Sequence, residues 1–431
     1  MTKTLGRILA FALSALLVIG CFSVAIAESS TSDKFYIYAF NTDLEKQLTL
    51  LYERYPELKD KIVYVNAGSS DTFQEKIDAL LKTPDAEDYP DIFCLEGGFI
   101  MKYANSDYTM DVSKLGITAD DMAQMYPYTL DLAKDPRDGS VKALSWQACP
   151  GAFYYNADVA EKYLGITSPE DMAAAISGWD NFLATARKLN ESSAGAAKIL
   201  SSNDDVYYLF VSNKENPWVD QSGVFHSDPM VSQYMETVKT LVDEKLTWNT
   251  SSWGQEWYAS MSSGDVLGYF GPTWFANGVL KGSAGDTAGH WRVCQPTVPY
   301  YWGGTWMAVS SECKDLDTAA KVMRVMTCDT DSMTELAEQF GEFSNNKAAI
   351  QKVIADGKSG YDLLGGQDFY QFFSNMASNV DVSFFSAYDT KANELIRVQV
   401  AAYANGEKTL DQAISDFEDA FAEAFPSVTF E

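Results

Sequence analysis

Apolar and polar positions near the N-terminus follow two alternating patterns. Short apolar runs at 35–40, 61–65 and 91–95, which contain aromatic and β-branched residues, are typical of buried strands. Between these runs, apolar residues recur at helical spacing over 44–55 and again over 73–81. The order strand, helix, strand, helix, strand predicts a parallel sheet and therefore an α/β protein.

Both predicted helices begin with the pattern of a capping box. The motifs Thr42-Asp43-Leu44-Glu45 and Thr72-Phe73-Gln74-Glu75 place a hydroxyl three residues before a carboxylate. In this arrangement each side chain satisfies a backbone N–H of the first helical turn. The motifs therefore predict helix starts at Thr42 and Thr72.

The loops that follow the three strands are the first candidates for a site. Ligands of parallel sheets lie beyond the carboxyl ends of the strands, and this rule selects residues 40–43, 68–70 and 96–98. Candidate hydrogen-bonding side chains in these loops are Asn41, Asp43, Ser70 and Glu96. For Asn41 and Ser70, helix capping is an equally good interpretation.

The rest of the chain continues as a mixture of strands and helices. Apolar runs at 141–144 and 152–155 predict strands, and residues 145–151 between them look like a crossing between two lobes. Helices are predicted over 157–164, 179–189, 231–246, 317–326, 393–404 and 409–425.

An aromatic segment over residues 248–306 holds seven of the ten tryptophans in the chain. Glycine and proline interrupt it every few residues, so many of its aromatic side chains fall on loops. Aromatic rings on loops present flat apolar faces that suit sugar rings. The alternative interpretation places most of these tryptophans in an ordinary core, because Trp is highly buried on average.

The N-terminal residues have the pattern of a targeting segment. Lys3 and Arg7 precede an apolar run that is too short for a membrane anchor. Two processing sites compete: a lipobox that ends at Cys21, which would be lipidated, and an A-x-A site at Ala25-Ile26-Ala27. Either one predicts an exported protein, as a cell-surface lipoprotein or as a secreted or periplasmic protein.

Charge and size limit the function further. Removal of residues 1–27 takes away Lys3 and Arg7 and no acid, so 30 of the 32 Lys and Arg remain against 60 Asp and Glu, a formal charge of −30. Such a surface repels nucleic acid and anionic membranes. Roughly 400 residues exceed what one core supports, which predicts two domains.

Few motifs of catalysis or metal binding are present. The only histidines are His226 and His290, and no G-x-S-x-G motif occurs, which argues against a Ser-His-Asp hydrolase. The five cysteines after Cys21 are an odd number without a C-x-x-C motif, so free thiols are expected rather than a disulfide scaffold or a zinc site. No cofactor and no metal are expected. A glycosidase, which needs only two acidic residues placed by the fold, remains an alternative.

Several motifs, taken in order, resemble a known family. They are Tyr89-Pro90-Asp91-Ile92, Pro150-Gly151-Ala152-Phe153-Tyr154-Tyr155-Asn156-Ala157-Asp158, Gly271-Pro272-Thr273-Trp274-Phe275, Trp302-Gly303-Gly304-Thr305-Trp306 and a tail over 401–413. Their order and spacing resemble the extracellular solute-binding proteins of ABC importers, in the carbohydrate-binding group similar to maltose-binding protein.

The resemblance implies an α/β, two-lobed periplasmic-binding-protein fold (type II-like) with a ligand cleft between lobes that a three-crossing hinge joins. After a signal peptide over 1–27, the N-terminal lobe would comprise 28–149 and 303–342, and the C-terminal lobe 150–302 and 343–431. The crossings would lie near 148–151, 302–305 and 341–345. The implied protein is a monomer and no enzyme, its lobes close on the ligand, and ABC permease subunits recognise it.

The resemblance also implies roles in the cleft for aromatic residues. Trp274 and Tyr388 match stacking positions, and Trp146, Tyr154, Trp302 and Trp306 lie at or beside the crossings. Glu96 does not match cleanly the strand-end acid that the family often carries, because Gly97 and Gly98 follow it. Asn41, Asp43, Ser70 and Glu96 would donate or accept hydrogen bonds.

Three hypotheses follow. The first is a surface protein that binds an oligosaccharide and passes it to a permease. The second keeps the fold but binds a cationic or amino solute, with Glu96 and Asp43 paired to an amine inside an aromatic cage. The third is the secreted glycosidase.

Overall fold

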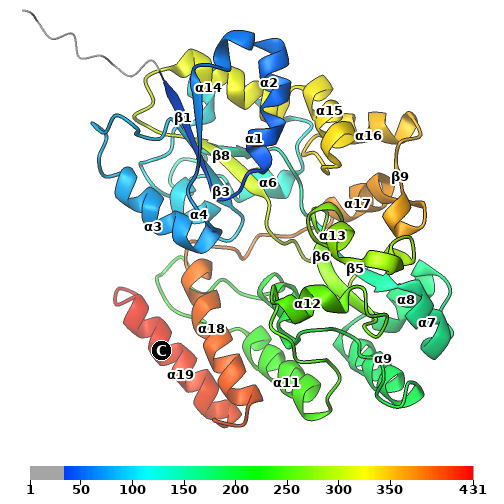
Figure 1. Ribbon diagram of the computed structural model, residues 1–431. Coiled ribbons are helices and arrows are strands. Elements are labelled where there is room, and N and C mark those ends of the chain that lie inside the picture. Colours follow the sequence, from blue (N-terminus) through cyan, green and yellow to red (C-terminus); the bar gives the residue numbers. More distant parts are fainter. Residues whose placement is uncertain (1–33, 431) are drawn as a thin grey trace, which may run out of the picture. The chain divides into compact units, whose positions relative to one another are not determined.

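The first sheet combines the N-terminal strands with two that arrive later in the chain. In the computed structural model, which describes residues 34–430, its strand order is β2-β1-β3-β8-β4 (Figure 1). Strand β1 (Phe35–Ala39) runs parallel to β2 (Ile62–Asn66) and β3 (Ile92–Glu96). Strand β8 (Thr305–Val309) is antiparallel to β3 and to β4 (Ala143–Ser145). The predicted parallel strands are confirmed, and an antiparallel pair extends them.

Alternating side chains divide this sheet between two cores. Tyr38, Phe93 and Leu95 contribute to one hydrophobic cluster, whereas their neighbours Ile37 and Cys94 contribute to another. Successive residues of a strand point to opposite faces, so a strand that is buried on both sides reads as a continuous apolar run. This explains why the sequence shows unbroken apolar segments here.

Helices cover both faces of the first sheet. They are α1 (Asp43–Gln47), α2 (Thr49–Arg54), α3 (Ser70–Leu80), α4 (Ile100–Ala104), α5 (Ala119–Met122), α6 (Pro127–Asp131), α14 (Leu316–Met323), α15 (Thr330–Phe340) and α16 (Lys347–Ala355). Apolar residues of α3 and α4 join the cluster that contains Tyr38, and those of α1, α2 and α14 join the cluster that contains Ile37.

The two predicted capping boxes are wrong in detail. The Thr42 side chain makes no capping hydrogen bond, and Asn41 Oδ1 accepts instead from the backbone N–H of Asp43 at 3.0 Å. Helix α3 begins at Ser70, so Thr72 lies inside its first turn and donates its hydroxyl to the Ser69 carbonyl. Short polar side chains in a loop can satisfy several nearby backbone groups, and the local pattern does not decide between them.

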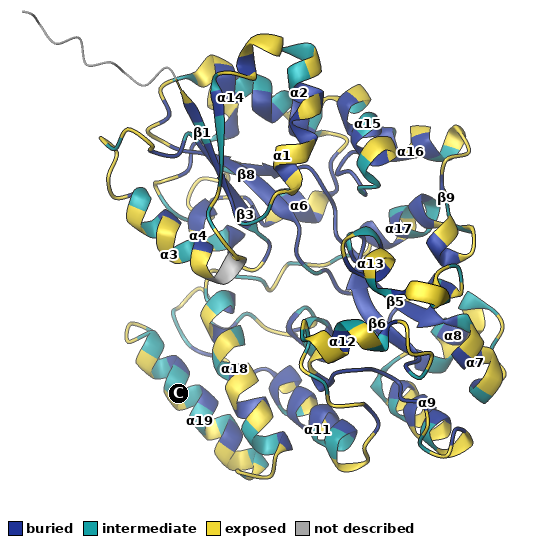
Figure 2. Ribbon diagram, viewed as in Figure 1, coloured by how far each residue is buried: buried dark blue, intermediate teal, exposed yellow. Residues whose placement is uncertain are grey.

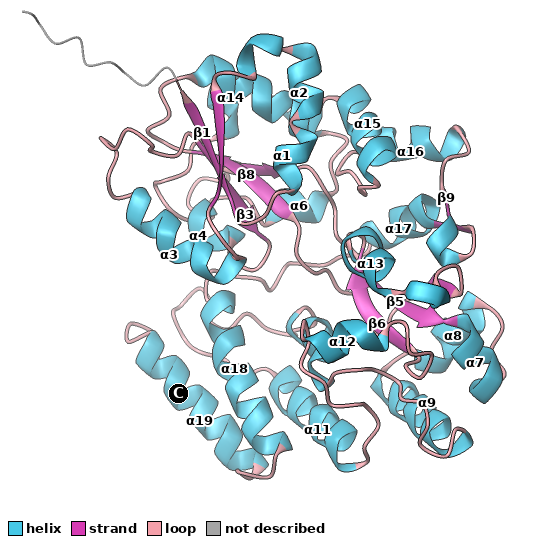
Figure 3. Cartoon of the chain, viewed as in Figure 1, coloured by secondary structure: helices cyan, strands magenta, loops and turns pink. Residues whose placement is uncertain are grey.

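The second sheet is small and antiparallel. Strand β5 (Gly151–Asn156) lies between β6 (Gly268–Pro272) and β7 (Trp291–Cys294). The associated helices are α7 (Ala157–Leu164), α8 (Pro169–Ile176), α9 (Trp179–Ser192), α10 (Tyr207–Val211), α11 (Pro229–Asp243), α12 (Gln255–Ser260), α13 (Lys281–Ser283), α17 (Phe369–Ala377), α18 (Asp389–Ala404) and α19 (Leu410–Ala424). A short hairpin of β9 (Gly360–Tyr361) and β10 (Gln367–Asp368) completes the pairing, and Figure 3 shows helices and loops around both sheets.

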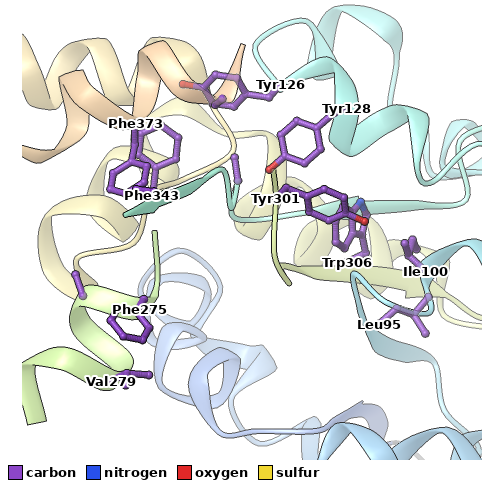
Figure 4. Packing of buried hydrophobic residues seen from close by; sticks show 14 of the residues in the cluster. Leu95, Ile100, Tyr126, Tyr128, Phe275, Val279, Tyr301, Trp306, Phe343 and Phe373 are labelled. Carbon is purple, nitrogen blue, oxygen red and sulfur yellow. The ribbon is translucent and has the colours of Figure 1, made fainter. Parts of the chain in front are cut away.

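One hydrophobic cluster includes one face of each sheet. Tyr154 of β5 and Trp306 of β8 both belong to it, although they come from different sheets. Aromatic pairs such as Tyr128 and Tyr301, with ring centroids 5.5 Å apart, are part of this packing (Figure 4). Figure 2 shows the result along the chain, with buried strands and helices whose outer faces are exposed.

The three predicted crossing segments lie side by side. The backbone N–H of Trp302 donates to the carbonyl of Cys149, and the N–H of Ala148 donates to the carbonyl of Phe343. The N–H of Asn345 donates in turn to the carbonyl of Trp146. The chain from Lys34 onward forms one compact unit, so the division into two lobes at these segments stays a prediction.

The predicted signal peptide over 1–27, which includes the lipobox Cys21, lies outside the described residues. Within the described part of the chain, none of the helices is both long and apolar enough to cross a bilayer.

The five cysteines of the described residues, Cys94, Cys149, Cys294, Cys313 and Cys328, are all free, as expected.

Candidate functional site

The loops at the strand ends come together at one large cavity. Its volume is about 1320 Å³, and the loops after β1, β2 and β3 all contribute to its lining. Asn41 and Asp43 come from the first loop, Ser69 from the second, and Glu96 with Gly97 and Gly98 from the third. The cavity therefore lies where the strand-end rule for parallel sheets places a ligand.

Four aromatic side chains line another part of the cavity, and we call them the aromatic wall: Trp253, Trp274, Trp302 and Tyr208. Trp302 stacks on Tyr208, with ring centroids 4.3 Å apart and planes 20° apart. Trp253 stacks on Trp274 at 6.1 Å, and Trp274 meets Trp302 edge to face at 5.1 Å. Such pairs hold each other's orientation and leave flat faces for a ligand.

A glycine turn connects the aromatic wall to the strand-end loop of β3. Gly303 has a φ of +72°, and a Cβ atom there would lie 3.1 Å from Trp274 Nε1 and 3.4 Å from Glu96 Oε1. The absence of a side chain thus keeps the space between the indole and the carboxylate open. The left-handed backbone also favours glycine on its own account.

Trp253 was not predicted as a site residue. Its φ of +66° is unusual for a non-glycine residue, and its side chain is 45 % exposed. Asp205 holds this loop, because its Oδ1 accepts from Ser252 Oγ at 3.1 Å and from Trp257 Nε1 at 2.9 Å. Burial raises the pKa of Asp205 to about 7. The signal available in the sequence was a tryptophan between serine and glycine, which suggests a loop but not a position at the cavity.

Three of the four predicted polar residues, Asn41, Asp43 and Glu96, line the cavity. Glu96 Oε2 accepts from the backbone N–H of Gly98 at 2.6 Å, and Asp43 Oδ1 lies 3.9 Å from Lys46 Nζ. Ser70 is the first residue of α3, and its side chain is outside what the structure describes.

Four predicted aromatic residues do not line the cavity. Trp146 and Tyr154 are fully buried, and Trp306, 1 % exposed, donates its indole N–H to the Thr129 carbonyl. Tyr154 likewise donates its hydroxyl to the Pro272 carbonyl at 2.8 Å. Tyr388 packs on Phe425 of the C-terminal end instead of facing the cavity. The structure therefore gives Trp146, Tyr154 and Trp306 core roles and leaves Tyr388 half-buried, packed against a hydrophobic cluster outside the cavity lining.

Most charged groups at the cavity are paired within the protein. Lys214 and Asp389 form a buried ion pair, and burial raises the pKa of Asp389 despite that partner. Arg397 Nη2 lies 3.8 Å from Asp204 Oδ2, and Arg397 Cζ lies 4.8 Å from the centre of the Tyr207 ring. These pairs organise the wall of the cavity and reduce the free charge that it presents.

Several buried polar atoms at the cavity have no hydrogen-bond partner within the described residues. They are Gln47 Oε1, Ser386 Oγ and Asn393 Oδ1. A buried polar atom without a partner is costly, so such atoms mark places where a ligand or water completes the hydrogen bonding.

The fold and the site together define a binding protein of the two-lobed periplasmic type. The chain belongs to the family of bacterial extracellular solute-binding proteins, whose model matches residues 57–359. No curated protein matches the chain in sequence.

Solved structures of the same fold are similar over nearly the whole chain. An ABC-transporter-associated binding protein from B. animalis subsp. lactis Bl-04, in complex with β-1,6-galactobiose, has a TM-score of 0.72 at 19 % identity, covering 93 % of this chain and 99 % of that one. The GacH receptor of Streptomyces glaucescens GLA.O, solved unliganded and with acarbose, has 0.68 at 18 %, covering 92 % and 99 %. The galacto-N-biose-/lacto-N-biose I-binding protein of Bifidobacterium longum has 0.70 at 16 %, covering 92 % and 98 %. At these identities the likeness establishes the fold.

Proposed function

We propose that this protein captures an uncharged oligosaccharide in the cavity and delivers it to an ABC permease in the membrane. The observation that carries the proposal is the aromatic wall, because Trp253, Trp274, Trp302 and Tyr208 offer apolar faces in a cavity that is also lined by residues with unpartnered polar atoms. Sugar rings have apolar faces and hydroxyl edges, which need both kinds of group. The oligosaccharide-binding proteins of the same fold support this ligand class.

The size of the cavity favours more than one sugar ring. Its volume of about 1320 Å³ exceeds the roughly 300–1,000 Å³ typical of pockets for small molecules. A single monosaccharide would leave much of the aromatic wall uncovered. We therefore expect at least a disaccharide.

A cationic or amino solute fits the cavity less well. Asp204 is paired with Arg397, Asp389 with Lys214, and Glu394 with Lys391. An amine would have to compete with these cations for the same carboxylates, and with Lys46 for Asp43, one of the two acids of the cationic hypothesis. The charge pattern thus supports an uncharged ligand over the cationic alternative.

The glycosidase is also less well supported. A glycosidase places two carboxyl groups on either side of the scissile bond. Asp205 instead holds the Trp253 loop by hydrogen bonds, and Asp389 is held in a buried ion pair. We infer binding without catalysis, in agreement with membership of a family of binding proteins.

The partners and location follow from the same proposal. The exported protein would be held at the cell surface by a lipid on Cys21, or be released after cleavage behind Ala27. It would act as a monomer and present its closed form to the permease subunits. The crossing segments would serve as the hinge for that closure.

The test is a ligand panel measured by thermal unfolding of residues 28–431. The panel contains maltotriose, β-1,6-galactobiose, lacto-N-biose, glucose, spermidine and amino acids. At a hundred times its Kd, a ligand adds about 2.7 kcal/mol of stability, which raises the Tm by several degrees. Chromatography of the recovered sugar checks that it is intact. A shift with spermidine alone, or breakdown of the sugar, would contradict the proposal.

A further inference from the structure

A cluster of three polar side chains lines the cavity outside the aromatic wall. Gln47 comes from the end of α1, Gln147 from the segment after β4, and Glu342 from the segment after α15. Gln47 Nε2 lies 3.1 Å from Glu342 Oε1, and Gln147 Nε2 lies 3.5 Å from Glu342 Oε2. Both carboxyl oxygens thus face neutral amide donors.

Gln47 has hydrogen-bonding capacity that the protein does not use. Its side chain is 2 % exposed, and its Oε1 has no partner among residues 34–430. Gln147 is 7 % exposed, and its Oε1 accepts from the thiol of Cys149 at 3.2 Å. A buried acceptor at a cavity wall suits a ligand that donates a hydrogen bond.

Burial of Glu342 disfavours a negative charge more strongly than its hydrogen bonds favour one. In the described part of the chain no cation forms an ion pair with it; the carboxylate of Asp43 raises its pKa, whereas the hydrogen bond from Gln47 lowers it. The charge of Glu342 in turn raises the pKa values of Cys149 and Tyr370, and both of these groups are uncharged when protonated. Lys46 lines the same cavity, but its recorded ion pair is with Asp43. Burial, together with the charge of Asp43, raises the pKa of Glu342 to about 8.

We propose that Gln47 and Glu342 form a subsite for hydroxyl groups of an uncharged sugar, and that Glu342 binds the sugar as the neutral carboxylic acid. The O–H of the acid donates to a sugar oxygen, and Gln47 Oε1 accepts a sugar hydroxyl. A hydroxyl group both donates and accepts, which matches the pair. This subsite rests on the function proposed above and adds the protonation state to it.

Sugar binding is then coupled to the protonation of Glu342. Below about pH 8 Glu342 already holds the proton, so capture of the sugar needs no exchange with solvent. Above that pH, the carboxylate must take up one proton from solvent before the sugar binds. The apparent affinity is proportional to the fraction of protein in which Glu342 is protonated. One pH unit above the pKa, this fraction is about one tenth, so the affinity is about tenfold lower.

The experiment is isothermal titration calorimetry at pH 7 and pH 9 with the panel oligosaccharide that binds most tightly. At pH 9 we expect a Kd about tenfold weaker than at pH 7 and, from buffers of different ionisation enthalpy, uptake of about 0.9 proton. Glu342→Gln keeps a neutral donor and acceptor, so it should bind within about threefold of the wild type at pH 7 and take up no proton at pH 9. Gln47→Leu removes the acceptor and should weaken binding about tenfold at pH 7.

Glu338→Gln is the matched control, because Glu338 pairs with Lys358 away from the cavity. It should retain the pH dependence of the wild type. No proton uptake by the wild type at pH 9, or a Glu342→Gln variant that folds and loses binding at pH 7, would overturn the subsite while the sugar still binds. If no oligosaccharide binds the wild type at pH 7, the proposed function fails, and the subsite fails with it.

Discussion

Trp274 donates its indole N–H to the backbone carbonyl of Trp302 at 3.3 Å, while the two rings meet edge to face. This contact joins a residue after β6 to one of the predicted crossing segments. It fixes the Trp274 ring, because the hydrogen bond and the ring contact set its position and its tilt. The ring face left open to the cavity is therefore pre-organised for a ligand.

Replacement of Trp274 by alanine tests the aromatic wall. We expect Trp274→Ala to weaken oligosaccharide binding by about 2 kcal/mol, or about thirtyfold, as for a central aromatic contact. Calorimetric titration measures the change. Trp248→Ala is the control, since Trp248 is 39 % exposed and lies outside the cavity. Equal Kd values for the two variants would refute a stacking role.

Gly303→Ala separates backbone strain from intrusion into the site. The new Cβ atom would approach both Trp274 and Glu96, and the left-handed backbone would cost about 1–2 kcal/mol of stability. Gly139→Ala has the same backbone cost, with a φ of +76° and no atom within 4 Å of its Cβ. Both variants should unfold at lower urea concentration, but only Gly303→Ala should bind sugar more weakly. Unchanged binding by Gly303→Ala would show that the space is not used.

Asp205 should make the stability of the protein depend on pH. Its pKa is about 7 in the folded protein and 3.8 when unperturbed, so the folded state holds a proton that the unfolded state releases between these values. Its contribution to stability is complete below about pH 4 and is lost as the pH rises to about 7. Urea midpoints at pH 5 and pH 8 should therefore differ more for the wild type than for Asp205→Asn. Parallel behaviour of the two proteins would contradict this assignment.

The buried pair of Lys214 and Asp389 should be costly to break on one side only. Lys214→Met leaves the carboxylate of Asp389 without its cation, which should cost about 3–5 kcal/mol of unfolding free energy. The double variant Lys214→Met/Asp389→Asn should recover most of the loss. Lys391→Met breaks an exposed pair with Glu394 and should cost less than about 1 kcal/mol. Denaturant unfolding measures all three, and additive losses in the double variant would argue against coupling.

The strands and their end loops were predictable because the signals are local. A continuous apolar run marks a strand that is buried on both faces, as in β1 and β3, and the helical period marks α7 at Ala157–Leu164 without error. Strand polarity then places Asn41, Asp43 and Glu96 at the cavity. Trp274 and Trp302 were identified by the family resemblance and by their glycine-rich surroundings.

Other tryptophans could not be assigned in this way. Trp306 and Trp302 are four residues apart, yet Trp306 lies inside β8 and points into the core, while Trp302 precedes the strand and reaches the cavity. Trp253 reaches the cavity because Asp205, distant in sequence, holds its loop. Residue type and local pattern are alike in these cases, and only the packing separates them.

The sequence by itself determined the first three strands and the helices between them, the loops at the ends of these strands and the family of the protein. The tertiary structure decided which aromatic rings face the cavity and which fill the core. It also decided the surroundings of Glu342, whose hydrogen-bond partner Gln47 is 295 residues away. The physical reason is that exposure and protonation depend on what surrounds a side chain, and here those neighbours come from distant parts of the chain.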